Sequence, residues 1–362
     1  MKILWFSHRD IKNPRAGGAE RTIYEVSRRL VSKGNTLIWE SVSWNDKYSK
    51  ETVDGINIKR EKNNLLMHLK VSKIIKDEKP DFIIDDMGHA VPFLSEDFTK
   101  IPGIVFFRHL HRRSLKGQVS LPLRMILSGL ETSYPLFYRK WNFVTESNSS
   151  INDLINLGIK KERIIQIPPG VDTDLFKPIK KSEFPSIVYF GGFRDYKRPW
   201  EILFVMKNLI NKYGNIRLYM IGSGSSLDKA KNISENLNIN NNVEFLGRLD
   251  NDKLAKVVGS SWINVHSSIT EGFGLSILES SSAGTPTIAY NVPGVRDVII
   301  NGENGYLVKD GSREYMHDKI VEIIINYNKK WIVDSRNIAM KYSWDKTAEL
   351  WNSIIKNMII SN

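Results

Sequence analysis

Short apolar runs alternate with amphipathic stretches along the whole chain. In the first half, runs typical of buried strands lie at residues 3–7, 37–42, 56–59, 80–85, 104–107, 143–145 and 164–167. Helical spacing places Ile23, Val26 and Leu30 on one face, and the same spacing recurs at 66–75, 121–137 and 151–157. Strands that alternate with helices predict an α/β fold built on a parallel sheet.

The alternation begins again after a polar connector at residues 179–185. Apolar runs at 186–190, 217–221, 242–246, 262–265 and 286–290 predict strands, residues 251–258 predict a helix, and two further helices end the chain. We therefore predict two doubly wound domains, residues 1–179 and 180–344, followed by a closing helix at 345–362.

Composition narrows the class of protein. With 41% hydrophobic and 25% charged residues, the chain resembles a globular protein, and the absence of cysteine excludes disulfides and a cysteine nucleophile. There is no run of eighteen apolar residues, and the apolar start at residues 1–7 is too short for a signal peptide, so we expect a cytoplasmic protein. The net charge of +12 favours anionic partners, namely nucleotide phosphates, nucleic acid or a bilayer surface, although solvated lysine-rich faces explain it equally well.

Glycine turns follow the first predicted strand of each half. The turn of the first half contains Gly17 and Gly18, and the turn of the second half contains Gly191 and Gly192. A further turn, after the next strand of the second half, contains Gly222. Three cations, Arg194, Lys197 and Arg198, accompany the turn at 191–192, where we expect a helix to begin. Glycines let the backbone approach a ligand, and cations at a helix N-terminus favour a diphosphate.

The segment from Glu271 to Glu279 contains two acidic residues around the turn Gly272-Phe273-Gly274. A strand precedes the turn and a helix follows it, so the free N–H groups of the helix start can bind an anion. A carboxylate in the first turns of such a helix can bind the paired hydroxyls of a sugar ring. The pattern therefore predicts a site for a sugar nucleotide.

Residues 108–113 form a basic segment, Arg-His-Leu-His-Arg-Arg, directly after a buried strand. One interpretation is a solvated basic loop. The other is a substrate-facing cluster in which an imidazole contacts a sugar hydroxyl and the arginines bind phosphate. Metal ligation is disfavoured because no third ligand is evident and the adjacent arginines repel a cation.

Aromatic and basic residues close the predicted helix at 121–137 and continue to Trp141. This mixture suits a bilayer interface or a lipid-phosphate acceptor. It equally suits a helix that packs on its own domain with snorkelling ends.

Taken in order, these motifs resemble the family-four group of retaining GT-B glycosyltransferases. The resemblance rests on the glycine loop at 17–20, the segment from Ser149 to Pro178, the motif at 191–197, Gly222-Ser-Gly224, Glu271 with Glu279, and the turn at 302–305. It implies two Rossmann-like domains that face each other across a cleft, with the closing helix crossing back to the first domain. It further implies a retaining hexosyltransferase that moves glucose or mannose to a glycan or lipid-linked glycan.

The resemblance also implies roles for individual residues. The catalytic set consists of Glu271 toward the transferred sugar, Lys197 and Arg194 toward the leaving diphosphate, and His109 toward the sugar's primary hydroxyl. The sugar-nucleotide site would use Gly17, Gly18, Gly191, Gly192, Gly222, the amides of Phe273, Gly274 and Leu275, and Glu279 on the ribose. The acceptor or its lipid would meet His111, Arg112 and Arg113, with His111 as the fallback for His109. No metal ligand is expected and no cofactor is required, because Lys197 would neutralise the leaving diphosphate, as a metal ion does in other transferases.

Two positions depart from the family pattern. The arginine that usually follows the motif glycine is replaced by Gly192, so Arg194 would substitute for it from two residues on. The usual asparagine before Gly170 is Pro169, which alters a turn rather than the chemistry.

Substrate identity stays open at this point. UDP-sugar and GDP-sugar enzymes share these motifs, and we expect no nucleic-acid partner because the cations concentrate in turns rather than on one face. Peripheral contact with an anionic membrane, at the inner face of the cell membrane, is expected. The alternatives are a sugar-nucleotide epimerase of GT-B fold and a basic, non-enzymatic membrane-surface protein.

Overall fold

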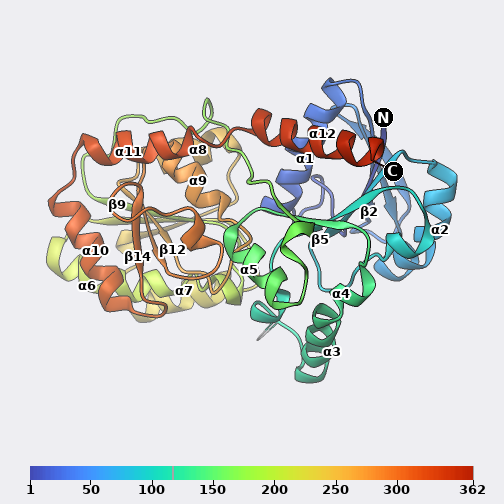
Figure 1. Ribbon diagram of the computed structural model, residues 1–362. Helices are drawn as coiled ribbons and strands as arrows, with labels where there is room; N and C mark the ends of the chain where they lie inside the picture. Colours follow the sequence, from blue (N-terminus) through green and yellow to red (C-terminus); the bar gives the residue numbers. More distant parts are fainter. Residues whose placement is uncertain (116–117, 362) are drawn as a thin grey trace. The chain divides into compact units, whose positions relative to one another are not determined.

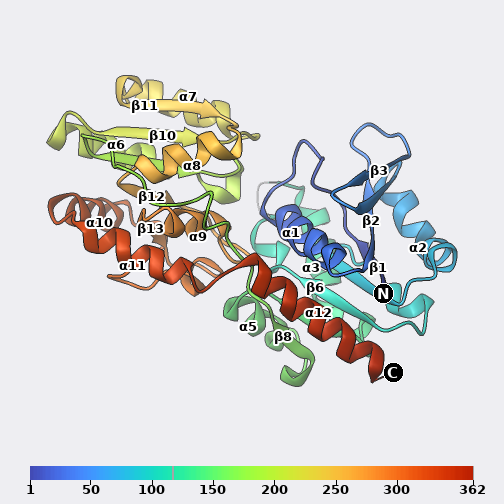
Figure 2. The same ribbon diagram turned by 90° about the horizontal axis from the view of Figure 1, so that it is seen from above.

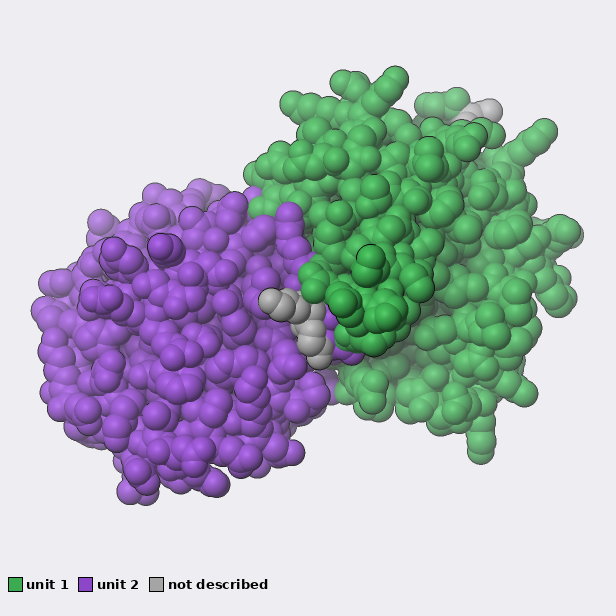
Figure 3. Space-filling model, turned by 90° about the horizontal axis from the view of Figure 1, so that it is seen from below, with its two compact units in different colours: residues 1–112, 119–170, 344–362 green, residues 113–118, 171–343 purple. Residues whose placement is uncertain are grey.

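The computed structural model describes residues 1–115 and 118–361 and divides the chain into two compact units (Figures 1, 2 and 3). Unit 1 comprises residues 1–112, 119–170 and 344–362, and unit 2 comprises residues 113–118 and 171–343. The structural boundaries therefore lie at 170/171 and 343/344, whereas the sequence prediction placed them at 179/180 and 344/345.

Unit 1 contains an eight-stranded sheet in the order β3-β4-β2-β1-β5-β6-β7-β8. Its strands are β1 (Lys2–Phe6), β2 (Thr36–Val42), β3 (Ser49–Val53), β4 (Ile56–Glu61), β5 (Phe82–Met87), β6 (Gly103–Phe107), β7 (Asn142–Thr145) and β8 (Ile164–Gln166). All neighbours pair in parallel except β3, which runs antiparallel to β4. The helices are α1 (Gly18–Ser32), α2 (Asn64–Glu78), α3 (Leu121–Thr132), α4 (Tyr134–Phe137), α5 (Asn148–Asn156) and α12 (Trp344–Ile360).

The first strand shows how the sequence builds two hydrophobic layers in unit 1. Successive side chains of a strand point to opposite faces, so Ile3 and Trp5 enter one layer and Leu4 and Phe6 enter the other. The first layer includes the apolar faces of α1 and α12, and Trp5 lies 5.2 Å from Trp351 of α12, measured between ring centroids. The closing helix thus belongs to the first unit, as the family resemblance implied.

Unit 2 contains a six-stranded, wholly parallel sheet in the order β11-β10-β9-β12-β13-β14. Its strands are β9 (Ser186–Phe190), β10 (Arg217–Ile221), β11 (Val243–Gly247), β12 (Ile263–His266), β13 (Thr287–Tyr290) and β14 (Gly305–Val308). In Figure 1, one face of this sheet is covered by α6 (Glu201–Tyr213), α7 (Leu227–Asn236) and α10 (Arg313–Ile325), and the other by α8 (Asn251–Ser260), α9 (Leu275–Ser282) and α11 (Lys329–Ala339). Helices on both faces explain why the strands are continuous apolar runs.

Several local predictions were wrong. The helix expected over 121–137 is divided into α3 and α4, because Pro135 cannot donate a backbone hydrogen bond and is tolerated only in a first helical turn. The helix expected to begin within residues 191–198 begins later, because these residues form a loop with a short 3-10 turn and Arg198 adopts a left-handed conformation with φ of 48°. The helix α6 therefore begins at Glu201. The exposed edge strand β3 and the helix α7 were not predicted, and α10, α11 and α12, rather than two helices, end the chain.

Within the described ranges, no helix combines the length and the apolar character needed to cross a bilayer.

Candidate functional site

The strand order of unit 2 reverses between β9 and β12. From β9 the chain adds β10 and β11 on one side, and then returns to place β12 on the other side of β9. Loops leaving the carboxyl ends of two such strands run in opposite directions, which opens a crevice where ligands bind in α/β proteins. The two loops at this point are residues 191–200 and 267–274, and they contain the motifs that the sequence analysis selected.

An ion pair joins these two loops. The Nζ atom of Lys197, in the β9 loop, donates to Oε1 of Glu271, in the β12 loop. The same oxygen accepts from Ser268 Oγ at 2.6 Å and lies 3.2 Å from Nε2 of His266, the last residue of β12. Lys197 and Glu271 are mostly buried, with 19% and 12% of their side chains exposed. The structure therefore brings two of the four predicted catalytic residues, Lys197 and Glu271, into direct contact.

The environment holds both members of this pair in their charged forms. Burial by itself raises the pKa of Glu271, but the Lys197 ammonium and the contact with His266 outweigh it and hold that pKa well below its usual range. Burial likewise lowers the pKa of Lys197, and the Glu271 carboxylate reverses this and raises it. The Arg194 guanidinium is near enough to lower the pKa of Lys197 slightly, so the two predicted cations act on the same region.

Backbone contacts fix the loops around the ion pair. Ser267 Oγ donates to the carbonyls of Lys197 and Arg198 at 2.9 and 2.8 Å, and Arg198 Nε returns a bond to the Ser267 carbonyl at 2.8 Å. Gly294 lies against the Glu271 backbone, where an added Cβ would sit 2.2 Å from the Glu271 carbonyl oxygen. Arg198, the third cation of the expected diphosphate site, is thus committed to holding the two loops together.

The helix α9 begins directly after the turn. Gly274 occupies the N-cap position with a left-handed φ of 98°, and having no side chain it cannot cap the helix itself. The first N–H groups of a helix lack intrahelical acceptors, and the helix dipole adds positive potential there. Phe273 is buried and packs edge-on against Tyr342, so its side chain belongs to the core of unit 2. Glu279 lies one turn further along the same helix.

The turns after β9 and β10 contain glycine for different structural reasons. A Cβ on Gly222 would lie 1.9 Å from the Gly191 carbonyl oxygen, so this glycine is required by the packing of the two loops. Around Gly191 and Gly192 there is room for a Cβ, with no heavy atom closer than 3.7 Å. The backbone explains Gly191, because L side chains rarely adopt its φ of 154°. Neither φ nor the packing of the described residues requires a glycine at 192, so a role of this turn in approaching a ligand stays a prediction.

Unit 1 reverses its strand order between β1 and β5. The predicted glycine loop lies beside this point, where α1 begins at Gly18. The Gly17 N–H donates to Glu20 Oε2 at 2.7 Å, and Arg9 Nε donates to the other oxygen of Glu20 at 2.8 Å. Gly17 is extended, with room for a Cβ. The loop is thus held by Glu20, which the sequence analysis did not assign a role.

Histidines gather at the same edge of unit 1. His8, just after β1, lies 4.4 Å from His89, just after β5, with the rings stacked, and His8 Nε2 lies 3.3 Å from His68 Nε2 of α2. Burial lowers the pKa of His8 well below its ordinary value of 6.5, and the neighbouring imidazoles lower it further. A cluster of three imidazoles, in which His8 is stacked on His89, therefore lines the place where this sheet would bind a ligand. Sequence reasoning missed His8 and His68, because a single histidine after a strand or on a helix carries no motif.

The basic segment at 108–113 is not a solvated loop. Arg108 is buried and binds Asp86 and Glu146 at 2.8 and 3.2 Å. The backbone N–H groups of His111 and Arg112 and the Nε of Arg112 donate to the buried carboxylate of Glu131. These carboxylates neutralise Arg108 and partly neutralise Arg112, which weakens the expected phosphate-binding role of Arg112.

The two predicted histidines of this segment lie together. The ring centroids of His109 and His111 are 4.8 Å apart, and His111 Nε2 lies 3.1 Å from the carbonyl oxygen of Met87, the last residue of β5. Arg113 falls in the short segment that groups with unit 2. In residues 1–115 and 118–361, no three His, Asp or Glu side chains are arranged to hold a metal ion.

Comparisons with known proteins agree with this architecture. Residues 16–175 match the family Glycosyltransferase Family 4, and residues 171–339 match Glycosyl transferases group 1. An uncharacterised glycosyltransferase of Methanocaldococcus jannaschii is 32% identical over 60% of this chain and 56% of its own length. The chain spans about half the length of the curated relatives it matches.

Solved structures are similar over the whole chain. Sucrose-phosphate synthase from Thermosynechococcus elongatus superposes with a TM-score of 0.83 over 100% of both chains, at 17% identity. HepE from Anabaena, solved in complex with UDP-glucose, has a TM-score of 0.77 over 100% of both chains, at 16% identity. At these identities the similarity establishes the fold, two Rossmann-like domains of GT-B type. Together with family matches that run from residue 16 to residue 339, this fold places the chain in glycosyltransferase family 4, among the group 1 glycosyltransferases.

Proposed function

We propose that this protein is a retaining hexosyltransferase that moves glucose or mannose from a nucleoside-diphosphate sugar to a hydroxyl of a glycan or lipid-linked glycan. The observation that carries the proposal is the Lys197–Glu271 pair at the switch point of unit 2, beside the N-terminus of α9. Cations and free amides at one sheet edge favour a diphosphate, and a buried carboxylate beside them can accept hydrogen bonds from sugar hydroxyls.

The reaction needs positive potential where the leaving group gains charge. In the proposed step, the bond between the anomeric carbon and the diphosphate oxygen breaks, and the acceptor oxygen bonds to that carbon on the same face. The acceptor proton passes to the leaving phosphate oxygen. Lys197, Arg194 and the amides of residues 273–275 stabilise the departing diphosphate, and the loss of one such group typically costs about 3 kcal/mol of transition-state stabilisation.

The remaining roles follow from position. Glu271, fixed by Lys197, His266 and Ser268, would accept hydrogen bonds from the transferred sugar, and Glu279 would bind the ribose hydroxyls. In unit 1, His109 would bind the sugar's primary hydroxyl, with His111 beside it as the alternative.

We further propose that no metal ion is required, because Arg194 and Lys197, the latter sharing its charge with Glu271, would supply positive potential to the leaving diphosphate. Turnover should be equal in EDTA and in Mg²⁺ or Mn²⁺. A strict requirement for added divalent cation would overturn this assignment.

The sugar nucleotide can be identified by thermal shift. A ligand at about 100 times its Kd stabilises a protein by about 2.7 kcal/mol. The sugar nucleotide that the protein binds should therefore raise its Tm, which distinguishes UDP-glucose from GDP-mannose. UDP-sugars come first in such a screen, because the structurally similar HepE was solved with UDP-glucose. Nucleotide release that depends on a glycan acceptor would support a transferase, whereas release or isomerisation with the sugar nucleotide alone would indicate an epimerase or hydrolase. Stabilisation by no sugar nucleotide would contradict the proposed function.

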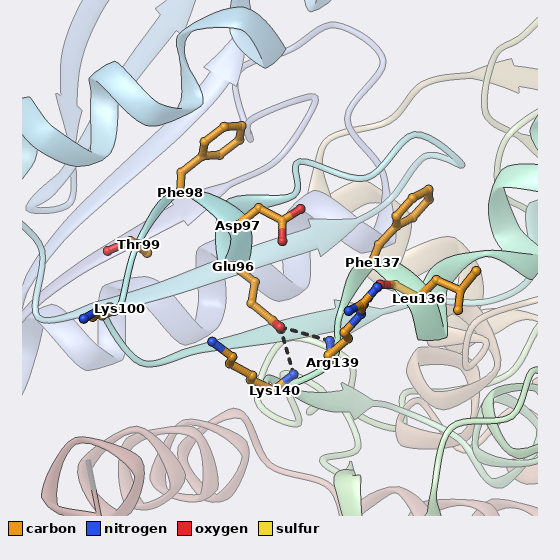
Figure 4. Close-up of a pocket in the computed structure, with 9 residues that line it drawn as sticks. All are labelled: Glu96, Asp97, Phe98, Thr99, Lys100, Leu136, Phe137, Arg139 and Lys140. Atoms are coloured by element: carbon orange, nitrogen blue, oxygen red, sulfur yellow. Dashed lines mark hydrogen bonds between the residues drawn. The ribbon is translucent and has the colours of Figure 1, made fainter.

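The acceptor side of the proposal includes contact with an anionic membrane at its cytoplasmic face. Of the aromatic residues expected at this interface, Tyr134, Tyr138 and Trp141 are instead buried in the core of unit 1, so the contact would depend on other side chains. The helix α3 buries only Glu131 and exposes apolar side chains, namely Leu121, Leu123, Met125 and Ile126, by 44–68%. A pocket of about 820 Å³ in the same unit adds Lys100, Arg139 and Lys140 beside the apolar Phe98 and Leu136 (Figure 4). Glu96 and Asp97 also line this pocket and offset part of its positive charge. Apolar side chains that insert and cations that meet phosphate are the two components of interfacial binding.

Vesicle co-sedimentation tests the membrane contact. The full chain should bind vesicles of phosphatidylglycerol with phosphatidylcholine and should bind pure phosphatidylcholine weakly, with binding that falls as salt rises. The double variant Met125→Asp/Ile126→Asp should lose this binding. The matched control is Leu65→Asp/Leu69→Asp on α2, whose side chains are 69% and 71% exposed. Equal loss in both variants, or no loss in either, would refute the role of α3.

A further inference from the structure

The loop after β2 exposes a tryptophan. Trp44 is 45% exposed, and the Cζ atom of Arg60 lies 4.8 Å from the centroid of its indole ring. A guanidinium over an aromatic ring is an attractive contact that orients the ring. The indole is therefore supported from within the protein while part of its surface faces solvent.

The support beneath Trp44 is rigid. Arg60 is only 4% exposed, and its Nε and one terminal nitrogen donate to the two carboxylate oxygens of Asp10, both at 2.7 Å. Asp10 is fully buried and also accepts from Ser41 Oγ at 2.8 Å, and the guanidinium of Arg60 forms a second ion pair with Glu51. A bidentate carboxylate locks the plane of a guanidinium, so the ring that rests on it has little freedom.

Trp44 and the residues that support it lie where α/β proteins bind ligands. Asp10 follows β1, Trp44 follows β2 and Arg60 is near the end of β4, and these neighbouring strands run parallel. All three residues are thus at the carboxyl edge of the sheet, where α/β proteins bind their ligands. The same edge carries the stacked His8 and His89 at the switch point.

The neighbours of Trp44 are polar. Asn45, Asp46 and Lys47 follow it in the chain and are exposed, and Tyr48 comes next with 47% of its side chain exposed. A bilayer or a large protein interface requires a contiguous apolar surface, which this loop does not offer. The flat ring of Trp44, with Tyr48 four residues further on and hydrogen-bonding groups between them, instead matches a pyranose ring, which has an apolar C–H face and a rim of hydroxyls.

We propose that Trp44 is a stacking platform for a pyranose of the acceptor glycan. This inference rests on the proposed glycosyl transfer, since it assigns a binding site for the acceptor of that reaction. Trp44 would contribute to acceptor affinity and not to the chemical step, so its loss should raise the acceptor KM and leave kcat and sugar-nucleotide affinity unchanged. The polar loop residues 45–47 would select among hydroxyl arrangements.

Fluorine NMR on the full chain tests the platform without a known acceptor. The protein is labelled with 5-fluorotryptophan, the Trp44 resonance is assigned with Trp44→Phe, and methyl α-mannopyranoside, methyl β-glucopyranoside and N-acetylglucosamine are titrated. A single stacked sugar should saturate the site in the millimolar range, where binding free energies are about −4 kcal/mol. The expected result is a saturable shift of the Trp44 resonance by at least one sugar, in the presence and absence of saturating UDP.

Variants of Trp44 distinguish stacking of an aromatic ring on the sugar from burial of an apolar side chain of any shape. Trp44→Phe should retain sugar binding, measured by saturation-transfer NMR, whereas Trp44→Leu and Trp44→Ala should weaken it about tenfold, equal to about 1.4 kcal/mol. Tyr315→Ala, which removes a 57% exposed aromatic ring from unit 2, is the matched control and should have no effect. None of these residues is in the proposed catalytic set.

Every outcome decides the proposal. If no sugar shifts the Trp44 resonance, or if the shift disappears when UDP is added, Trp44 is not an acceptor platform. Equal binding by Trp44→Leu and wild type would likewise overturn stacking. Failure of the proposed function is a different result, because then no sugar nucleotide would stabilise wild type or Trp44→Ala.

Discussion

The contact between Lys197 and Glu271 allows structural and catalytic contributions to be separated. Lys197→Met leaves the mostly buried Glu271 carboxylate with only Ser268 and His266, and Glu271→Gln leaves the buried Lys197 ammonium without its carboxylate. Removing one partner of a buried ion pair costs about 3–5 kcal/mol, because the other charge stays buried without compensation. For a domain of this size, each 1 kcal/mol lowers Tm by about 2–4 °C, so each single variant should lower the Tm of unit 2 by about 6–20 °C.

The double variant Lys197→Met/Glu271→Gln has no buried charge left to compensate. Its free energy of unfolding should therefore recover by at least about 2 kcal/mol relative to either single variant, because replacing both members of a buried pair is often nearly neutral. Turnover should not recover. The loss of Lys197 removes a group that stabilises the leaving diphosphate, at a cost of about a hundredfold in rate.

Calorimetry and urea denaturation give the stability cycle, and nucleotide release at saturating sugar nucleotide gives the activity cycle. The matched control is the exposed pair Lys73 and Asp77, whose side chains are 72% and 58% exposed, where the corresponding cycle should show little or no coupling because solvent screens the charges. Recovery of turnover together with stability in the double variant would show that Lys197 acts only through the fold. Single variants as stable as wild type would refute the structural part of the reasoning.

Three further predictions concern the glycine contact, the histidine cluster and the closing helix. Gly294→Ala should reduce turnover strongly, because its Cβ would lie 2.2 Å from the Glu271 carbonyl oxygen. The control Gly311→Ala, also at positive φ but with open space around it, should lower the free energy of unfolding in urea by only about 1 kcal/mol and leave turnover intact. Equal effects of the two substitutions would contradict the steric argument. The pKa of His8 is lower in the folded than in the unfolded chain, so the unfolded chain binds the proton first as the pH falls. Below pH 6.5 the free energy of unfolding of wild type should therefore fall, relative to that of His8→Phe, by up to about 1.4 kcal/mol per pH unit. Urea denaturation from pH 7.5 to 5.5 tests this, and a pH-independent difference would refute it. Trp351→Ala should destabilise unit 1 by about 3–5 kcal/mol, because Trp351 is fully buried against Trp5 and Phe106, and calorimetry should show the transition of unit 2 unchanged.

Local sequence patterns determined much of this protein. Apolar runs and helical spacing are properties of a few consecutive residues, so they predicted the alternating strands and helices and the α/β class. They also located the glycine turns and the pair of acids around Gly272-Phe273-Gly274, because turn chemistry is equally local. The predictions failed where a local rule was interrupted, as at Pro135 and at the left-handed Arg198.

Only the tertiary structure decided which side chains meet. Lys197 and Glu271 are 74 residues apart, and they meet because β12 returns to pair with β9 after β10 and β11 have been added on the other side. Strand order depends on the packing of whole units, which no short window of sequence contains. The same reason explains why Arg108, predicted as part of a basic cluster, is neutralised by Asp86 and Glu146. Sequence patterns thus supplied the candidate residues, and long-range packing determined their partners, burial and charge.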